Sequence, residues 1–195
     1  MAAGDDLPRV EISSRAEWRK WLAEHHAKSG SIWLITWKKR HGGRHVPYDH
    51  IIEEALCFGW VDSLPRKLDA NRSMLLLSPR KPRSAWSRIN KERVERLIAG
   101  KMMTPAGLEV IEAAKASGTW KALEEVEDLV IPDDLAKVFQ GYAQAAANFA
   151  AFHRSVKRGI LEWIAQAKRS ETRSKRVSET AARAAESIRA NLWRQ

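Results

Sequence analysis

The run Ser31–Lys38 (SIWLITWK) constrains the fold of this chain more than any other stretch. Its β-branched and aromatic residues are typical of strands. Alternation places Ile32 and Leu34 on one face and Trp33 and Ile35 on the other. Because both faces are mostly apolar, we expect a central strand that is covered on both sides.

Two shorter runs, Val61–Leu68 and Arg72–Ser78, also favour strands. They are joined by Asp69-Ala70-Asn71, which is plausible turn chemistry. The sequence therefore predicts a hairpin, and with the first run a small sheet of three strands.

Helical patterns occupy most of the remaining chain. Ser14 and Glu17 have capping-box spacing, and Trp18, Trp21 and Leu22 then recur on one helical face. After the hairpin the sequence reads as helical throughout, with a cap and a proline start at Thr104-Pro105 among its signals. We expect an α+β fold that is mostly helical, with its small sheet in the N-terminal part and a helical C-terminal half.

Two regions are expected, a core domain over residues 1–130 and a helical region over residues 131–195 that packs on the core or projects from it. The last helix, from Glu171 to about Asn191, has few large apolar residues. Removing Ser170–Gln195 is therefore expected to leave a folded core.

The net charge of +10 is distributed unevenly. Residues 1–65 carry nine basic and nine acidic side chains, and residues 66–101 carry eleven and three. Residues 102–152 carry three and eight, and residues 153–195 carry eleven and four. Two basic blocks thus flank an acidic segment, which indicates either a polyanionic partner or solubility combined with internal pairing.

Cellular location is expected from what the sequence contains. Cys57 is the only cysteine, so no intrachain disulfide can form and a reducing compartment is expected. The N-terminal residues MAAGDDLPRV do not form a secretory signal, and no apolar run approaches the length of a membrane span. We expect a cytoplasmic protein without a transmembrane segment, with no metal and no cofactor.

An anion site is predicted on the segment between Ser78 and Ser87 (SPRKPRSAWS), where prolines stiffen a cationic arm that leads into a helix. Trp86 would stack on a base or cover a guanidinium. The alternative is a structural arm that pairs with Glu53, Glu54 or the acidic segment 124–134. The residues assigned to the anion site are Arg80, Lys81, Arg83, Ser84, Trp86 and Ser87.

A second candidate site lies around Asp62, which follows a helix end among apolar residues. The favoured interpretation is a structural ion pair with Arg66, Arg80 or Lys38. The alternative is a pocket between sheet and helices. The residues of this candidate pocket are Lys38, Tyr48, Trp60, Asp62 and Arg66. Cys57 is expected to be a small buried hydrophobic residue.

A third candidate is the basic C-terminal tail, whose cations spread around a helix instead of lining one face. Such a helix would follow a phosphate backbone, or it is a solvated surface helix. The cations concerned are Lys168, Arg169, Arg173, Lys175 and Arg176.

Four motifs carry a resemblance to a known family. They are ALCFGWVD at residues 55–62, SPRKPRSAWS at 78–87, GKMMTPAG at 100–107 and AKRSETRSKR at 167–176. Together they resemble the signature of the YdeI/OmpD-associated family, a bacterial family often titled bacteriocin-protection. The resemblance runs from about Arg15 to about Asn191.

This resemblance implies a role in resistance to cationic antimicrobial peptides or bacteriocins and an association with an outer-membrane porin. It implies no catalytic residues. A cytoplasmic location would not allow direct contact with a porin, and a basic protein would not hold a cationic peptide on its basic surfaces.

Three functions therefore compete. The first is a non-enzymatic, cytoplasmic, stress- or bacteriocin-protection-type protein that binds an anionic small molecule or polyanion through the Arg80–Trp86 arm. The second is a nucleic-acid-binding protein that uses both basic blocks. The third is an enzyme with an unassigned site around Lys38, Tyr48, Asp62 and Arg80.

Overall fold

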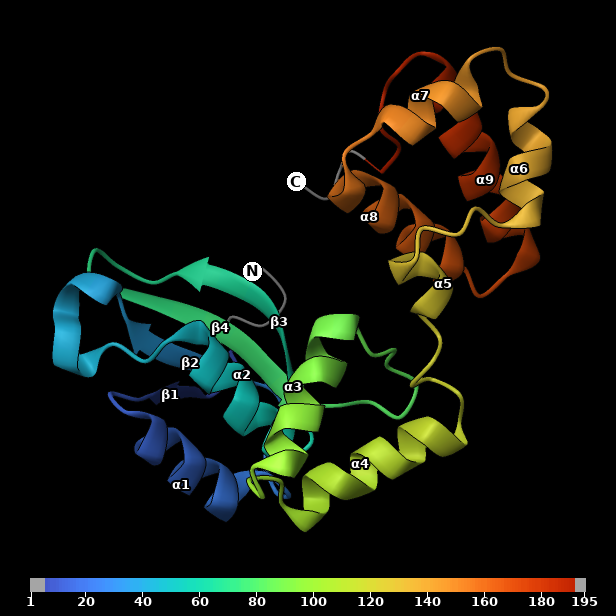
Figure 1. Ribbon diagram of the computed structural model, residues 1–195. Coiled ribbons are helices and arrows are strands. Elements are labelled where there is room, and N and C mark those ends of the chain that lie inside the picture. Colours follow the sequence, from blue (N-terminus) through green and yellow to red (C-terminus); the bar gives the residue numbers. More distant parts are fainter. Residues whose placement is uncertain (1–5, 192–195) are drawn as a thin grey trace. The chain divides into compact units, whose positions relative to one another are not determined.

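The computed structural model describes residues 6–191 and divides the chain into two compact units, Met1–Lys121 and Ala122–Gln195 (Figure 1). The division falls before the boundary expected at residue 130. The first unit holds the sheet with its helices, and the second unit is helical.

The first unit is built on a four-stranded sheet with the strand order β1-β2-β4-β3. β1 pairs in parallel with β2, whereas β2 with β4 and β3 with β4 pair antiparallel. The strands are β1 (Arg9–Glu11), β2 (Ile32–Trp37), β3 (Trp60–Lys67) and β4 (Arg72–Pro79). The α+β class and the three expected strands are confirmed, but a sheet of only three strands was wrong.

The fourth strand, β1, has no sequence signal of its own because it is only three residues long. It is held by pairing with the central strand. The Trp33 N–H donates to the carbonyl of Pro8 at 2.9 Å, and the Ile12 N–H donates to the carbonyl of Ile35 at 3.1 Å. The expected turn between β3 and β4 is confirmed, since Asp69 Oδ1 accepts the backbone N–H groups of Asn71 and Arg72 at 2.7 Å each.

The helices of the first unit pack on one face of this sheet, where α1 and α2 lie in Figure 1. The expected caps are confirmed: the hydroxyls of Ser14, Ser87 and Thr104 each accept the N–H three residues later. The helical elements are α1 (Arg15–His25), the 3-10 element η1 (Lys39–Arg44), α2 (Tyr48–Cys57), α3 (Arg88–Ala99) and α4 (Pro105–Ala116).

Both faces of β2 are covered, as its sequence predicts. Ile32 and Leu34 belong to the main core with the helices. Trp33 and Ile35 are buried on the opposite face with Met74 and are packed by Leu7, Leu68 and Leu76.

α4 approaches the end of α2 so closely that only glycine fits at residue 107. A Cβ placed there would lie 2.3 Å from the carbonyl oxygen of Cys57. The Thr104 hydroxyl donates to the same oxygen at 2.6 Å. Cys57 itself is a buried free thiol, as expected, and burial raises its pKa to about 11.

The second unit packs its helices around small and aromatic side chains. Phe139 and Phe149 have ring centroids 5.4 Å apart. The helices are α5 (Glu124–Glu127), α6 (Asp133–Phe139), α7 (Ala145–Ala151), α8 (Arg154–Ala165) and α9 (Ser170–Ala185).

The expectation that the last helix projects or packs loosely is wrong. α9 contacts α6, α7 and α8, and it buries Val177, Thr180, Ala181 and Ala184. Its alanines are fully buried because small side chains let neighbouring helix backbones approach closely. A scarcity of large apolar residues therefore does not indicate a loosely attached helix here.

Candidate functional site

The arm between β4 and α3 is anchored by a buried cation and a buried indole. Arg80 is 9% exposed and Trp86 is 1% exposed. The guanidinium carbon of Arg80 lies 3.8 Å from the ring centroid of Trp86, and Arg80 Nη1 donates to the carbonyl of Ala85 at 3.0 Å. The backbone N–H of Arg80 donates to the carbonyl of Gly59 at 2.9 Å, which fixes the start of the arm.

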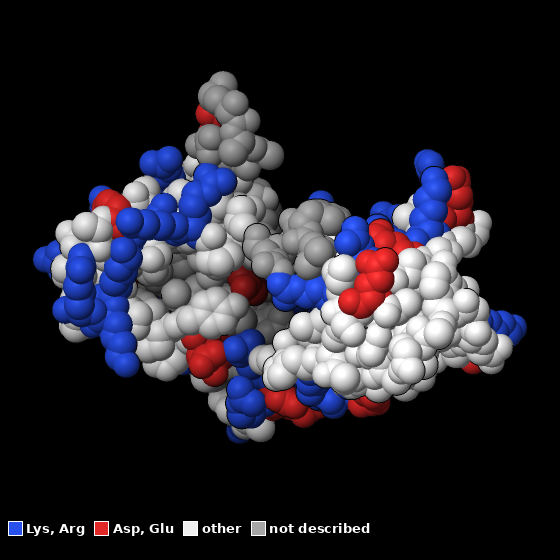
Figure 2. Space-filling model, turned by 90° about the horizontal axis from the view of Figure 1, so that it is seen from above, with Lys and Arg blue, Asp and Glu red and all other residues white. Residues whose placement is uncertain are grey.

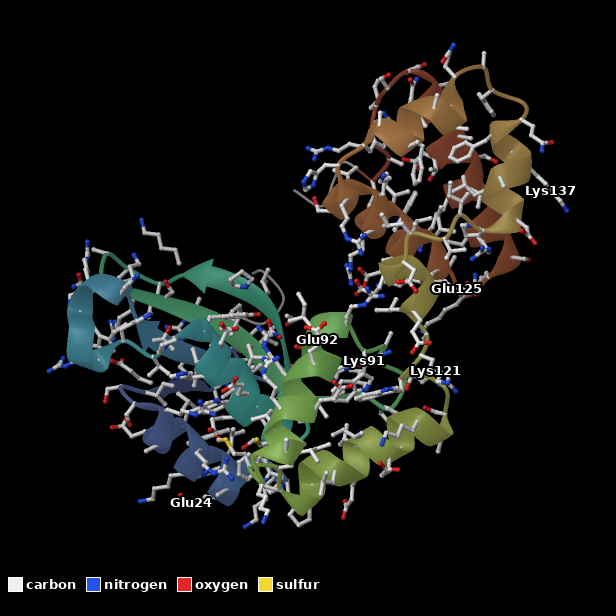
Figure 3. All side chains as sticks on the ribbon, in the orientation of Figure 1. Glu24, Lys91, Glu92, Lys121, Glu125 and Lys137 are labelled. Carbon is white, nitrogen blue, oxygen red and sulfur yellow. The ribbon has the colours of Figure 1, made fainter. Side chains whose placement is uncertain are left out.

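A layer of alternating cations and indoles continues from this anchor. The rings of Trp86 and Trp120 have centroids 5.0 Å apart. Lys91 of α3, labelled in Figure 3, has its Nζ 5.5 Å from the Trp120 ring. Cation–π and aromatic contacts of this kind explain how a guanidinium can be held in a core without a carboxylate partner in hydrogen-bond contact.

Burial corrects part of the expected anion site. Trp86 covers the guanidinium of Arg80 and is not exposed to stack on a base, so both residues support the arm from beneath. Ser87 uses its hydroxyl to cap α3. Of the expected residues, Lys81 and Arg83 are exposed, and Ser84 is half-buried with its N–H donated to the carbonyl of Lys81.

The structural alternative, in which the arm pairs with Glu53 or Glu54, is wrong for Glu54. Its two carboxylate oxygens accept Arg15 Nε at 2.6 Å and Arg19 Nη1 at 2.7 Å. Glu53 also pairs with Arg15, at 2.9 Å.

Three residues of the second candidate site and the arm lie together. The Tyr48 hydroxyl donates to Asp62 Oδ2 at 2.6 Å. Burial lowers the pKa of Arg80 to about 10, and the negative charge of Asp62 acts in the opposite direction. Arg93 of α3 pairs with Asp49 at 2.5 Å beside this group. Asp62 therefore connects the first turn of α2 to the anchored arm.

The five residues proposed as a pocket are not gathered into one site. Lys38 Nζ donates to the carbonyls of Asp69 and Ala70 at the hairpin turn, at 2.8 and 2.9 Å. Arg66 has its guanidinium carbon 4.6 Å from the Trp33 ring, on the sheet face opposite the helices. Trp60 is buried and donates its indole N–H to the carbonyl of His26 at 3.3 Å. Only Tyr48 and Asp62 are in direct contact.

Alkaline pH tests the environment of Tyr48. Burial raises the pKa of its phenol above the usual range, and the hydrogen bond to Asp62 raises it further. The folded state therefore holds this proton more tightly than the unfolded state does, so the associated stability is present below about pH 10 and is lost as pH rises further.

We expect the phenolate absorbance to contain a late component at high pH that is missing in Tyr48→Phe. Tyr142→Phe is the matched control, since Tyr142 is the other tyrosine of the chain. A native protein in which Tyr48→Phe leaves the last part of the titration unchanged would contradict this prediction.

The tail cations are used within the second unit. Arg173 pairs with Asp134 of α6 at 2.6 Å, and Lys175 pairs with Glu171 at 2.9 Å. Arg176 donates to the carbonyl of Trp163 and lies over its ring at 5.0 Å. These contacts favour the structural interpretation of the tail over a surface that follows a phosphate backbone.

One cluster was missed by the sequence interpretation. Glu54 is 1% exposed, and it joins Arg15 and Arg19 of α1 to α2. Arg19 Nη2 also donates to the carbonyl of Met102 at 2.9 Å, which connects the cluster to the loop before α4. The four-residue spacing of Arg15 and Arg19 places both on one helix face and was the available signal.

Within residues 6–191, no helix has the length and apolar character needed to cross a membrane. The same residues contain no group of three or more His, Cys, Asp or Glu side chains placed to hold a metal ion.

Two family models match the chain in separate segments. Residues 10–110 match the model described as "Domain of unknown function (DUF8412)", and residues 128–187 match the model described as "Bacteriocin-protection, YdeI or OmpD-Associated". No curated protein and no solved structure matches.

The two matches divide the motifs on which the family resemblance rests. The motif at 167–176 lies in the second match, whereas those at 55–62, 78–87 and 100–107 lie in the first. The YdeI/OmpD-associated resemblance is thus confirmed for the C-terminal part of the chain, and not for the whole span that was expected.

Proposed function

The chain belongs to the family of the domain of unknown function DUF8412, and on this premise we propose that it is a non-enzymatic protein of the bacteriocin-protection type that binds an anionic ligand through its arm. The match of residues 128–187 to the bacteriocin-protection family is the observation that carries the role. As part of the proposal, the protein acts in the cytoplasm, in keeping with its single cysteine, which is a free thiol.

The anchored arm supports an anionic ligand. Arg80 and Trp86 hold the base of the arm, so that Lys81 and Arg83 lie exposed on a loop that contains Pro82. A proline and a fixed base reduce the conformational entropy that the loop would lose on binding. α3 begins after the arm, and its first N–H groups favour a negative charge.

The sign of the charge argues for an indirect form of protection. A chain with a net charge of +10 repels a cationic peptide at long range, so direct capture of such a peptide on the basic surfaces is disfavoured. A phosphate-bearing metabolite or polyanion fits these surfaces better. On this proposal the protein would protect by responding to an anionic molecule instead of sequestering the toxic peptide.

Replacing the two exposed cations tests the ligand. Sodium pyrophosphate should raise the melting temperature of the native protein, because a ligand that binds only the folded state stabilises it by mass action. The double variant Lys81→Ala, Arg83→Ala should lose this increase and keep its own melting temperature, since both side chains are exposed. Arg80 is left in place because its burial makes it part of the packing.

The control is Lys20→Ala, Lys28→Ala, which removes two exposed cations from another part of the same unit. An equal loss of the pyrophosphate effect in this control would show that net charge is responsible and not the arm. The role is tested separately by expressing the protein in bacteria exposed to polymyxin B. The native chain should improve survival, and no improvement would exclude the protective role.

A further inference from the structure

η1 and the β3–β4 turn are tied to each other at one end of the sheet. The Lys38 N–H donates to the carbonyl of Asn71 at 2.9 Å, and Lys38 Nζ donates to two further carbonyls of the turn. Arg40 Nη2 donates to the carbonyl of Ala70 and to Asn71 Oδ1, and His41 Nε2 lies 3.2 Å from the same oxygen. Two segments about 30 residues apart in sequence thus form one surface, which we call the η1–turn surface.

The η1–turn surface is strongly basic. Segments 38–45 and 66–72 contain seven basic side chains and one acid, Asp69. Glu11 and Glu17 line the adjoining groove, so the local balance is seven basic against three acidic groups, or +4. Figure 2 shows Lys and Arg side chains gathered over the end of the first unit that carries these segments. The basic residues are Lys38, Lys39, Arg40, Arg44, Arg66, Lys67 and Arg72.

Beside these cations lies a groove of about 280 Å³ that Trp37 and Arg44 help to line. The guanidinium carbon of Arg44 is 5.0 Å from the Trp37 ring centroid, and that of Arg72 is 5.8 Å away. Arg72 is also paired with Glu11 and Asp69, whereas Arg44 is exposed. An exposed guanidinium held over an indole is an arrangement on which a nucleobase can stack.

We propose that the η1–turn surface binds single-stranded nucleic acid, with Lys39 and Lys67 contacting phosphates and Arg44 stacking on a base over Trp37. This activity is separate from the ligand proposed for the arm. It also differs from a nucleic-acid site built on the two basic blocks, because Lys39 and Arg44 lie outside both.

The same charges would attract an anionic membrane, but the neighbouring side chains favour nucleic acid. Peripheral membrane binding combines basic charge with apolar side chains that enter the lipid interface. Segments 38–45 and 66–72 contribute none of the exposed large hydrophobic residues identified among the described part of the chain. Instead they contribute arginines, a partly buried indole and an amide, which are groups that contact phosphates and bases.

Fluorescence anisotropy with a labelled oligothymidine of about 12 nucleotides tests the proposal on the full chain. The triple variant Lys39→Ala, Arg44→Ala, Lys67→Ala should bind at least about tenfold more weakly at low salt. Over about 50–200 mM salt, the slope of log Kd against log salt should decrease by about 2, since each lost phosphate contact of a single strand accounts for about 0.7.

The matched control is Lys20→Ala, Lys28→Ala, Arg96→Ala, which removes the same charge from exposed positions elsewhere in the first unit. It should bind the oligonucleotide within about threefold of the native chain. Equal weakening in both variants would overturn the proposal, because net charge alone would then explain binding. The η1–turn variant should keep its response to pyrophosphate, so that this proposal and the function proposed for the arm can fail separately.

Two further measurements address the base and the membrane. Arg44→Lys keeps the charge but loses the planar guanidinium, so it should abolish any preference for oligothymidine over an abasic strand of equal length. An unchanged preference would exclude stacking on Arg44. Sedimentation with phosphatidylcholine vesicles containing phosphatidylserine should show no η1–turn-dependent binding. If the triple variant lost vesicle binding while the native chain failed to bind the oligonucleotide, the surface would be a membrane site instead.

Discussion

Replacing Glu54 with alanine is expected to lower the free energy of unfolding of the first unit by about 3–5 kcal/mol, because removing one partner of a buried ion pair leaves uncompensated charge. Both carboxylate oxygens of Glu54 are within 2.7 Å of guanidinium nitrogens of α1. The Nη2 atom of Arg15 is already buried without a hydrogen-bond partner, so the cluster has no spare acceptor to replace the lost carboxylate. Loss of Glu54 should therefore separate α1 from α2.

Urea denaturation followed by tryptophan fluorescence would measure this effect, since seven of the nine tryptophans lie in residues 1–121. The control is Glu53→Ala, which removes the neighbouring carboxylate from a side chain that is 21% exposed. It should cost no more than about 1 kcal/mol. Glu54→Gln, which keeps the shape and one acceptor, should fall between the two. A loss of about 1 kcal/mol or less in Glu54→Ala would show that the cluster is not a main support of the fold.

Deleting Ser170–Gln195 is expected to unfold the second unit and to leave the first unit folded. α9 supplies one wall of the core formed with α6, α7 and α8, and its residues Val177, Ala181 and Ala184 are buried there. The deletion also removes Arg173, the partner of Asp134. Isolated helices as short as α6 and α7, each of seven residues, are not stable in water without such packing.

Circular dichroism should therefore show a loss of helix larger than the 16 residues of α9 alone. Limited proteolysis should cleave the remaining part of the second unit while the first unit resists. A point variant, Ala181→Asp, should reproduce much of the effect by burying an unpaired charge. Lys175→Ala, at a side chain that is 76% exposed, should be nearly neutral. A deletion protein that retained folded α6–α8 would restore the view that α9 is dispensable.

Local patterns were sufficient for most of the secondary structure. The alternation in Ser31–Lys38, the turn at Asp69 and the caps at Ser14, Ser87 and Thr104 depend on neighbours in sequence. Side-chain hydrogen bonds to nearby N–H groups form in the same way in many folds, so they can be read directly from residue types. The α+β class follows from these elements.

The candidate site was predictable only in part. Asp62 and Tyr48 were proposed for one site, and the structure places them in hydrogen-bond contact. The exposure of the arm was not predictable, because a Pro- and Arg-rich segment reads as surface until a core indole is placed beneath it. Trp86 receives the guanidinium of Arg80 because Trp120, from after α4, closes the other side of its ring.

The sequence by itself determined which segments form helices, strands and turns, how charge is divided along the chain, and that one strand must be covered on both sides. Only the tertiary structure decided that β1 joins the sheet, that Glu54 collects two arginines, that η1 meets the hairpin turn, and that an alanine-rich last helix is a core element. The physical reason is distance along the chain. Each of these features joins groups that are far apart in sequence, and burial then sets which polar groups must find a partner.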